Sequence, residues 1–592
     1  MTTGKFLSFL LIITALLRAT NGLPVPSNNQ FYYASQGNIN RDLKIGDLNF
    51  IHTTDTHGWL GSHPNEINYN ADWGDFISFT ANLKQTITAN KTRDFLLIDT
   101  GDKYDGNGLS DASLPHGKYS TAIFNKQDYD LLTLGNHELY TENNTIMEYY
   151  ETAKNSKFKG KYISSNVEFV DNNLDGKLVP FGDKYAYFQT ENLKKRILAF
   201  SFIFDFQRIN SRAKVTPIKE EITKEWFQQV IQRYDETQVD LIIVFGHLPI
   251  TDVENREINY LHSFLRSVYP NIVIQYFGGH SHIRDFVQFD AKSTGLQSGR
   301  FCETVGFLSI TNNSKDDSFP QFHRRYIDFN LRSFNYHLSN LGGLNIENSN
   351  GAEVSEEISK IRKKLNLDEV YGYIPQNYYM YYEPLTSKKN IYNLLINKIL
   401  PTLEVKHPTI PRYIMINTGA IRYDLYKGVF TKDTQYIVSP FGNEWNYIKL
   451  PSKLASKISD KINKGPVVLN IPEAHIFDIS DDGKCPFRHK KGLVKGYTTY
   501  DSYGCKGDDT IHNSLGYYEV PNVIQYTDDT TNDDTLVDFI FYSFLKPNIL
   551  SAINNINKDM KVTSHFFTDD DCFYYGGLST QDLLRRYFEQ FL

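Results

Sequence analysis

Gly135-Asn136-His137-Glu138 comes directly after the apolar run Leu131-Leu132-Thr133-Leu134, so polar side chains stand where a β-strand is expected to end. Four further clusters along the chain share this arrangement. They are Asp55-Thr56-His57 after residues 48–51, Gly101-Asp102 after 95–98, Gly246-His247 after 241–245 and Gly279-His280-Ser281-His282 after 272–277. Because loops at the carboxyl ends of neighbouring strands converge, we predict that these clusters form one site on an α/β sheet structure.

The residue types in these clusters are those of a metal site. A carboxylate can bridge two divalent cations about 3.5–4 Å apart, and Asp102 is our predicted bridge. Imidazole, carboxylate and amide oxygen together suit Zn, Mn or Fe better than Mg or Ca, which prefer all-oxygen surroundings. A lone Gly-His or Gly-Asp is ordinary turn chemistry, so the prediction rests on the whole ordered series.

The ordered clusters match D-x-H, G-D, G-N-H-[DE], G-H and G-H-x-H, and the sequence therefore resembles the calcineurin-like metallophosphoesterases. The resemblance implies a calcineurin-like four-layer β-sandwich with flanking helices that hydrolyses phosphoesters with two metal ions. Its implied ligands besides the bridge are Asp55, His57 and His282 for one metal, and Asn136, His247 and His280 for the other. It also implies that His137 donates the proton to the leaving oxygen, while Glu138 orients the loop.

The organisation of the chain changes after the last cluster. At 592 residues the chain is too long for one ordinary core, so two domains are expected. Loop composition from Leu341 precedes a helical pattern from Val354 to Leu367, which predicts a linker helix. Beyond it, a helix over 390–400 and strands over 412–416 and 435–438 predict an independent α/β unit. The expected parts are a catalytic domain (23–340), a linker (341–368) and a C-terminal substrate-binding domain (369–592).

Two stretches of the second half, Asn417-Thr418-Gly419-Ala420-Ile421-Arg422 and Pro440-Phe441-Gly442, resemble the nucleotide pocket of the 5′-nucleotidases. The resemblance implies that Asn417 lies in this pocket, that Arg422 contacts the substrate and that Phe441 stacks on the base. A stacked base gains about 1–3 kcal/mol. Core packing of Phe441 and ion pairing of Arg422 within the domain are the alternatives. In the place of the family's second pocket segment, Tyr503 would stack and Asp508 would accept from ribose hydroxyls.

The chain departs from the 5′-nucleotidase pattern at the catalytic histidine. The family's G-N-H-E-F-D ends in an Asp that holds the histidine, whereas this chain has Tyr140 at that position. We expect either that Glu142 substitutes or that the enzyme works at a lower pH or rate. The family's Arg on the first helix of the C-terminal domain is also replaced, by Lys389-Asn390. Tyr140, together with Cys505-Lys506-Gly507-Asp508-Asp509 in the second pocket segment, indicates a divergent branch similar to fungal secretory or vacuolar members.

The amino terminus has the pattern of a secretory signal. Residues 6–17 form an apolar run behind Lys5 that is too short to span a bilayer, and small residues favour cleavage after Gly22. We therefore expect a signal peptide at 1–22 and a secreted, cell-surface or vacuolar protein without a stable membrane anchor. An uncleaved anchor is the alternative.

Glycosylation and disulfides are expected in that compartment. Acceptor sequons begin at Asn90, Asn143 and Asn312. The chain has four cysteines; a Cys485–Cys505 bridge would leave Cys302–Cys572 as the other pair, but four cysteines permit three pairings and the sequence does not choose among them.

The predicted partner is a small-molecule phosphoester. A net charge of −7 argues against a general binder of nucleic-acid polymers, which would carry a basic face. We predict a metal-dependent phosphoester hydrolase that acts on nucleotide phosphomonoesters. The alternatives are a nucleotide-sugar or cyclic-phosphate diesterase, a general phosphomonoesterase, and a non-catalytic binding protein stabilised by its metals. The intact ligand set together with His137 argues against the last.

Overall fold

A computed structural model describes most of the chain. It covers residues 40–251, 255–311, 320–343, 346, 348–465, 507–510, 518–529, 533–560 and 565–591, and the backbone of three short strands, β18 (Leu493–Val494), β19 (Thr498–Thr499) and β20 (Ser514–Leu515). The predicted signal peptide, the sequon at Asn312, Cys485, Cys505 and Tyr503 lie outside the described residues.

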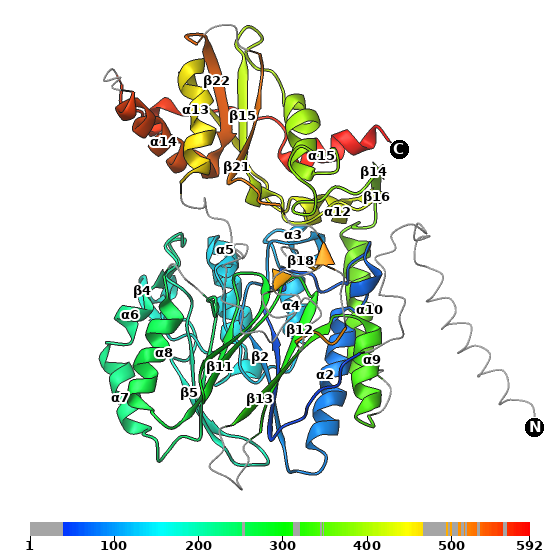
Figure 1. Cartoon of the computed structure of the whole chain (residues 1–592), viewed down its shortest axis with the longest axis vertical. Helices are drawn as coiled ribbons and strands as arrows, with labels where there is room; N and C mark the ends of the chain where they lie inside the picture. Colours follow the sequence, from blue (N-terminus) through cyan, green and yellow to red (C-terminus); the bar gives the residue numbers. More distant parts are fainter. Residues whose placement is uncertain are drawn as a thin grey trace, which may run out of the picture. The chain divides into compact units, whose positions relative to one another are not determined.

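Two sheets stack face to face in the first half of the chain (Figure 1). The smaller sheet has the order β13 (Gln321–Asp328), β12 (Thr304–Thr311), β1 (Leu48–Thr53), β2 (Asp94–Asp99). The larger has the order β19, β10 (Ile283–Asp290), β11 (Ser293–Ser298), β9 (Val273–Gly278), β8 (Leu241–Phe245), β6 (Arg196–Ser201), β5 (Ala186–Gln189). Because β1 and β2 are parallel, as are β6, β8 and β9, their carboxyl ends meet at one edge of each sheet.

Alternating side chains along each strand build the layers. In β1, Phe50 packs between the two sheets, while its neighbour Ile51 faces a core on the other side of the smaller sheet. In β8, Ile243 lies between the sheets and Val244 faces an outer core. The helices α2 (Trp73–Thr88), α9 (Leu331–Asn340) and α10 (Ser349–Lys364) cover one outer face, and α7 (Glu225–Arg233) and α8 (Glu257–Val268) cover the other (Figure 1). The predicted four-layer sandwich with flanking helices is therefore confirmed.

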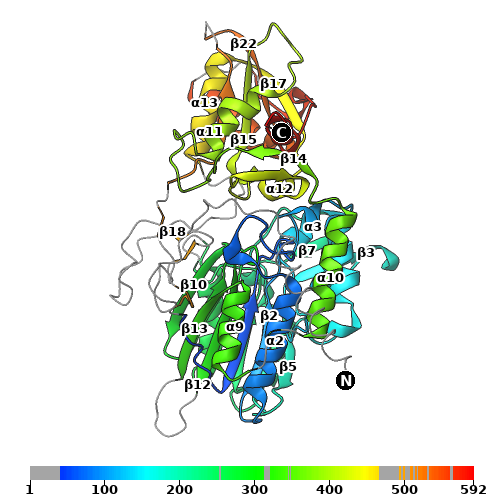
Figure 2. The same ribbon diagram turned by 90° about the vertical axis from the view of Figure 1, so that its right-hand side faces the viewer.

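The second half contains its own mixed sheet and core. The strand order is β21 (Val523–Thr527), β15 (Arg412–Asn417), β22 (Leu536–Tyr542), β17 (Trp445–Pro451), β23 (Phe573–Tyr574). The helices α13 (Ser452–Asn463), α14 (Lys546–Asp559) and α15 (Thr580–Glu589) contribute to this core, and α13 lies beside the sheet in Figure 2. The predicted α/β unit with a strand at 412–416 is thus confirmed.

Two predicted strands are wrong. Residues 131–134 form only isolated bridges, from Leu131 to Ile98 and from Leu132 to Tyr162. Residues 435–438 belong to the helix α12 (Lys432–Val438). Thr431 and Thr434 form a capping box at its start, and this local hydrogen bonding outweighs the strand preference of Ile437 and Val438.

The predicted linker helix begins earlier than expected. Asn348 caps α10, which places the loop-like residues 349–351 in its first turn. A Cβ on Gly74 of α2 would lie 2.1 Å from the carbonyl oxygen of Gly351, so only glycine permits these helices to approach so closely. Within the described part of the chain, none of the helices combines the length and apolar composition needed to cross a bilayer.

The predicted Cys302–Cys572 disulfide is wrong. Both residues have free thiols. Cys302 is buried in the core that contains Ile51, whereas Cys572 packs at the edge of the core of the second half. The two thiols therefore belong to different cores.

Candidate metal centre

The predicted ligands lie in the loops that leave the strands. Asp55 and His57 follow β1, Asp102 follows β2, His247 follows β8, and His280 and His282 follow β9. Asp55, His57, Asp102, His280 and His282 all have positive φ angles, from 45° to 76°. Non-glycine residues pay about 1–3 kcal/mol for such conformations, which collect at functional sites because the surrounding fold enforces them.

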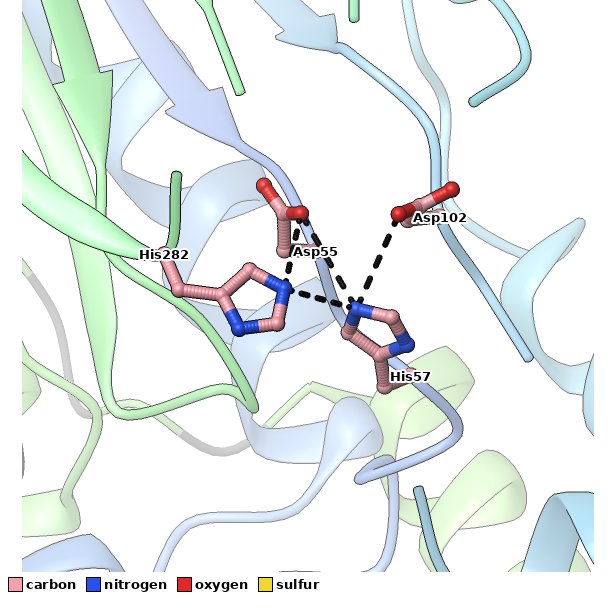
Figure 3. A group of neighbouring side chains, drawn as sticks. All are labelled: Asp55, His57, Asp102 and His282. Carbon is pink, nitrogen blue, oxygen red and sulfur yellow. Dashed lines mark hydrogen bonds and ion pairs between the residues drawn. The ribbon is translucent and has the colours of Figure 1, made fainter. Parts of the chain in front are cut away.

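One group of ligand atoms comes from four buried side chains, Asp55, His57, Asp102 and His282 (Figure 3). The Nε2 atoms of His57 and His282 are 3.0 Å apart. His282 Nε2 lies 3.2 Å from Asp55 Oδ1, and His57 Nε2 lies 3.8 Å from Asp102 Oδ2. All the ligand atoms lie within 4.8 Å of one another, which is close enough to surround one cation.

A second group comprises Asp102, His247 and His280. His247 Nε2 lies 2.9 Å from Asp102 Oδ2. The carboxylate of Asp102 thus belongs to both groups.

Several buried polar atoms here have no hydrogen bond of acceptable geometry among the described residues. They are Asp102 Oδ2, Asn136 Oδ1, His247 Nε2 and His280 Nδ1. Buried polar groups are almost always satisfied, so converging exceptions fit atoms that bind a cation. The donor set of the site therefore suits a metal.

Burial lowers the pKa of His57, His280 and His282 below the ordinary value for histidine, a neighbouring histidine lowers it further, and the charge of Arg422 adds to this effect. These imidazoles are therefore neutral, the form that binds metals. At His247, burial opposes charging, but the carboxylates of Asp102 and Asp55 raise the pKa to about 10. A cation between these groups would replace that proton.

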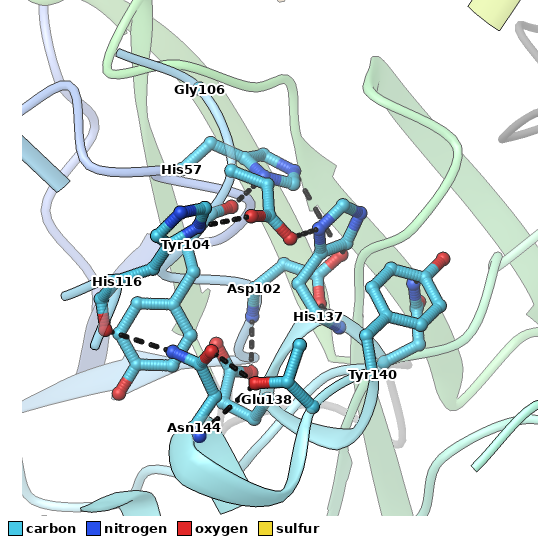
Figure 4. A network of polar contacts seen from close by, with 12 residues as sticks. His57, Asp102, Tyr104, Gly106, His116, His137, Glu138, Tyr140 and Asn144 are labelled. Carbon is cyan, nitrogen blue, oxygen red and sulfur yellow. Dashed lines mark hydrogen bonds and ion pairs between the residues drawn. The ribbon is translucent and has the colours of Figure 1, made fainter. Parts of the chain in front are cut away.

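Glu138 fixes the loop of the shared carboxylate. It accepts hydrogen bonds from the backbone nitrogens of Asp102 at 3.0 Å, Lys103 at 2.7 Å and Gly135 at 2.6 Å. Glu138 is fully buried, and it ties the Gly101-Asp102 turn to the Gly135-Asn136 turn (Figure 4).

The expected substitution by Glu142 is wrong. Glu142 is exposed and accepts a hydrogen bond from Ser211. His137 instead bonds through Nδ1 to Asp105 Oδ2 at 2.6 Å. Asp105 was missed because it lies in no motif, although it is only three residues after Asp102. The rings of His137 and Tyr140 meet edge to face, with centroids 4.7 Å apart (Figure 4).

The structure brings part of the predicted substrate pocket towards the metal ligands. The guanidinium of Arg422 lies 5.8 Å from the ring centroid of Phe441, and its charge acts on His57, His280 and His282. Phe441 is half-buried and belongs to none of the apolar cores formed by the described residues. Asn417 is buried at the end of β15.

Asp508 pairs with a strand of the first half, which corrects its expected role as an acceptor for ribose hydroxyls in the nucleotide pocket. Its Oδ1 accepts from Arg284 Nη1 at 2.7 Å, and the side chains of both residues are fully buried. The residue bridges to Tyr326 of β13, so it belongs to the sandwich of the first half. A carboxylate neutralised in this way is not available to a ribose hydroxyl.

Comparison with known proteins agrees with this architecture. The calcineurin-like phosphoesterase family matches residues 48–284, and the C-terminal domain of NAD nucleotidase matches residues 377–550. An uncharacterised protein of Saccharomyces cerevisiae is 51% identical and covers 99% of this chain and 100% of its own length. A protein of Arthroderma benhamiae described as secreted is 35% identical, over 93% of this chain and 90% of its own.

Among solved structures, a crystal structure of 5′-nucleotidase from Candida albicans is similar over nearly its whole length. It is 44% identical, covers 93% of this chain and 99% of its own, and has a TM-score of 0.84. The chain therefore belongs to the calcineurin-like metallophosphoesterases of the 5′-nucleotidase type. It is a metal-dependent phosphoester hydrolase.

Proposed function

We propose that this chain hydrolyses nucleotide phosphomonoesters with two divalent metal ions. The observation that carries the proposal is the membership of Asp102 in both groups of ligand atoms, as expected of a bridging carboxylate. The similarity to the 5′-nucleotidase of Candida albicans supports the nucleotide substrate.

The residues of the site would have two roles, metal binding and proton donation. Asp55, His57 and His282 would hold one ion, Asn136, His247 and His280 the other, and Asp102 both. The mixed ligand set favours Zn, Mn or Fe. Paired cations supply charge neutralisation at the phosphoryl oxygens and activation of the attacking water. His137, held at Nδ1 by Asp105, would give the proton on Nε2 to the leaving oxygen.

The second half would supply substrate recognition. Arg422 would bind the phosphate or ribose side of the nucleotide, and Phe441 would stack on the base. We retain 23–340, 341–368 and 369–592 as the catalytic, linker and substrate-binding parts. The segments 498–499 and 507–510 are an exception, because they pair with strands of the first half.

A pyrophosphate-linked dinucleotide is the second candidate substrate. The match of residues 377–550 to the C-terminal domain of NAD nucleotidase favours it. Such a molecule carries the same base and ribose as a nucleoside monophosphate, so the same stacking surface would serve both.

The experiment is metal analysis of the purified protein followed by a substrate panel. The panel contains nucleoside monophosphates, dinucleotides, nucleotide sugars, cyclic nucleotides and aryl phosphates. We expect about two metal ions per chain and the highest kcat/KM on nucleoside monophosphates. A highest value on another class would replace the proposed substrate.

A substitution at Asp102 tests its proposed role as the carboxylate that bridges both metals. Asp102→Asn should lower phosphate release by several orders of magnitude and reduce the metal content, because the amide offers one oxygen where a carboxylate offers two. Asp94→Asn is the matched control, a buried carboxylate at the opposite end of β2. Near-normal turnover by Asp102→Asn would refute the two-metal assignment.

We further propose entry into the secretory pathway, with the cell surface, the medium or the vacuole as destination. The Arthroderma benhamiae relative, described as secreted, supports this route. Asn90 and Asn143, which begin two of the sequons, are exposed. Glycosidase-sensitive mass on the native protein would test the proposal, and a mass equal to that of the unmodified full chain would contradict it.

A further inference from the structure

The residues proposed to bind the nucleotide belong to one stretch of the second half, residues 418–441, which we call the substrate segment. The backbone nitrogen of Arg422 donates to the carbonyl oxygen of Val438, the last residue of α12, at 3.0 Å. Phe441 follows shortly after, and its ring centroid lies 5.8 Å from the Arg422 guanidinium. The position of the substrate segment therefore decides where both residues meet a ligand.

Tyr423, the residue after Arg422, anchors the substrate segment to the first half of the chain. Its hydroxyl lies 2.5 Å from Glu66 Oε2, 3.0 Å from Glu303 Oε1 and 3.2 Å from His63 Nδ1. All four side chains are buried. Because buried polar groups that lose their partners cost free energy, this contact opposes a displacement of the segment.

This anchor continues into the metal ligands through one residue. His63 Nε2 lies 2.7 Å from the carbonyl oxygen of Phe301, whose backbone nitrogen donates to the carbonyl oxygen of Asp55 at 2.7 Å. The Phe301 ring packs against His57 and His282, with centroids 5.3 Å apart in each pair. Its φ of 53° is in the left-handed region, which a non-glycine residue adopts where the surrounding fold enforces it. Three predicted metal ligands thus contact the same constrained residue.

Asp433 is a second anchor, at the start of α12. Its Oδ1 accepts from the backbone nitrogen of Gly108 at 2.9 Å, and its Oδ2 accepts from Arg362 Nη1 of α10 at 2.6 Å. Gly108 begins α3 (Gly108–Asp111), on the loop that leaves β2 through Asp102. A Cβ on Gly108 would lie 2.9 Å from Asp433 Oδ1, so a larger residue would displace the carboxylate. The contact therefore joins α12 to the loop of the shared carboxylate.

We propose that Tyr423 and Asp433 are positioning residues. They hold the substrate segment against the catalytic half, so that a nucleotide meets Arg422 and Phe441 while its phosphate lies at the metal centre. Because both anchors are buried contacts of the protein alone, this register exists before the substrate binds. A misplacement of about 1 Å can cost about 100-fold in rate, so such a fixed register matters for turnover. The inference rests on the proposed function.

The first test is Tyr423→Phe, which keeps the ring and removes the hydroxyl. We expect kcat/KM for a nucleoside monophosphate to fall by about 10-fold, mostly through KM, because the base and ribose lose well-placed contacts. An aryl phosphate needs no contact with the substrate segment and should change by less than about twofold. Equal losses on both substrates would overturn the proposal, since a structural defect slows every substrate alike. The absence of any loss would overturn it too.

Tyr269→Phe is the matched control for this variant. Tyr269 is also buried, and its hydroxyl donates to the carbonyl oxygen of Tyr234 at 2.7 Å, but it lies at the end of α8. It should leave the ratio of the two kcat/KM values unchanged. Since both values come from one preparation, the ratio does not depend on the fraction of folded protein.

Asp433→Ala tests the second anchor and should lower the same ratio by about 10-fold. Asp528→Ala is its control. Asp528 likewise accepts from a backbone nitrogen and a guanidinium, both of Arg412, but this contact lies within the second half. If Asp528→Ala lowers the ratio as much as Asp433→Ala does, a general loosening of the second half is the cause and the proposal fails.

A double-mutant cycle shows whether Tyr423 acts through Arg422. In an Arg422→Ala background, Tyr423→Phe should cause little further loss on the nucleoside monophosphate. A further loss as large as that in the wild-type background would overturn the assignment.

Hydrogen exchange of the full chain without substrate makes the test independent of the identity of the substrate. Tyr423→Phe and Asp433→Ala should each speed exchange within residues 418–441 by about 10-fold, whereas the two control variants should not. Unchanged exchange would overturn the anchors even if nucleotides are hydrolysed. Faster exchange, together with no preference for nucleotides in the substrate panel, would support the anchors while refuting the proposed substrate.

Discussion

His137 lies beside the metal ligands without belonging to either group. Its Nε2 is 4.0 Å from Asp102 Oδ2, and its ring packs edge to face on His57. We predict that His137→Asn leaves both metals bound and lowers the rate by about 10²–10⁴-fold for poor leaving groups, because only the proton donor is lost. Metal analysis and kcat/KM test this together. Loss of metal would make His137 a ligand, and an unchanged rate would remove it from the mechanism.

At the residue scale, the motifs identified the side chains that the structure brings together around Asp102. Each follows an apolar run, and that local signal is readable in the sequence. Asp105 carries no such signal, because its importance comes from a left-handed turn that directs its carboxylate to His137. The role predicted for Asp508 is wrong because the sequence signal there is misleading rather than missing. Its similarity to a pocket motif is local, whereas its partner Arg284 is 224 positions away in the sequence.

At the element scale, the segment 507–510 lies against β13 and delivers Asp508 to Arg284. The guanidinium of Arg284 also bonds Asp328, and all of these side chains are fully buried. We predict that Asp508→Asn destabilises the fold by about 1–3 kcal/mol, because it weakens a buried charged hydrogen bond while Asp328 still faces the guanidinium.

Urea unfolding measures this effect. The matched control is Asp559→Asn, which removes one partner of the exposed pair with Lys461 and should cost at most about 1 kcal/mol. If both variants unfold at the same urea concentration, the buried charge network is not a source of stability.

Elements with a continuous apolar run were predicted from the sequence, and those defined by the residues at their ends were not. β1, β2, β8 and β9 follow from their apolar runs. In α12, the composition favours a strand, and the caps at Thr431 and Thr434 decide otherwise. The start of α10 depends on Asn348 and on the close contact between Gly74 and Gly351, which only the fold reveals.

At the scale of the whole molecule, Phe441 and Arg422 are distant in sequence from every metal ligand. Binding energy from the base should therefore support hydrolysis of nucleotides but not of small aryl phosphates. We predict that Phe441→Ala lowers kcat/KM for a nucleoside monophosphate by about ten- to a hundredfold and leaves an aryl phosphate almost untouched. Equal losses would make Phe441 a packing residue, and no loss on either would favour a general phosphomonoesterase.

Tyr423 joins the two halves through a buried carboxylate pair. Its hydroxyl lies 2.5 Å from Glu66 Oε2 and 3.0 Å from Glu303 Oε1. Burial, and secondarily the charge of Glu66, raises the pKa of Glu303 from 4.5 to about 8. The folded protein thus holds a proton that the unfolded chain releases. The stability from this proton is fully present below about pH 4.5 and is lost as the pH rises through about 8.

We therefore predict that the melting temperature of the wild-type protein falls more steeply between pH 5 and 9 than that of Glu303→Gln, whose amide does not titrate. Thermal unfolding of both proteins in matched buffers measures the difference. Parallel profiles would mean that Glu303 is not protonated in the folded protein.

Residues 498–499 pair with β10, and residues 507–510 pair with β13. These pairings limit where the chain can be cut into separate domains. β17 precedes these segments, β21 follows them, and both strands belong to the sheet of the second half. The chain therefore returns to the first sandwich between β17 and β21. A gene split after residue 368 would remove Asp508 from Arg284 and would also remove Asp509, which lies 3.1 Å from His337 Nε2. The amino-terminal fragment would then lack counter-ions in its own core. A chain cleaved into two fragments that stay associated should therefore preserve the active site better than a chain that ends at residue 368.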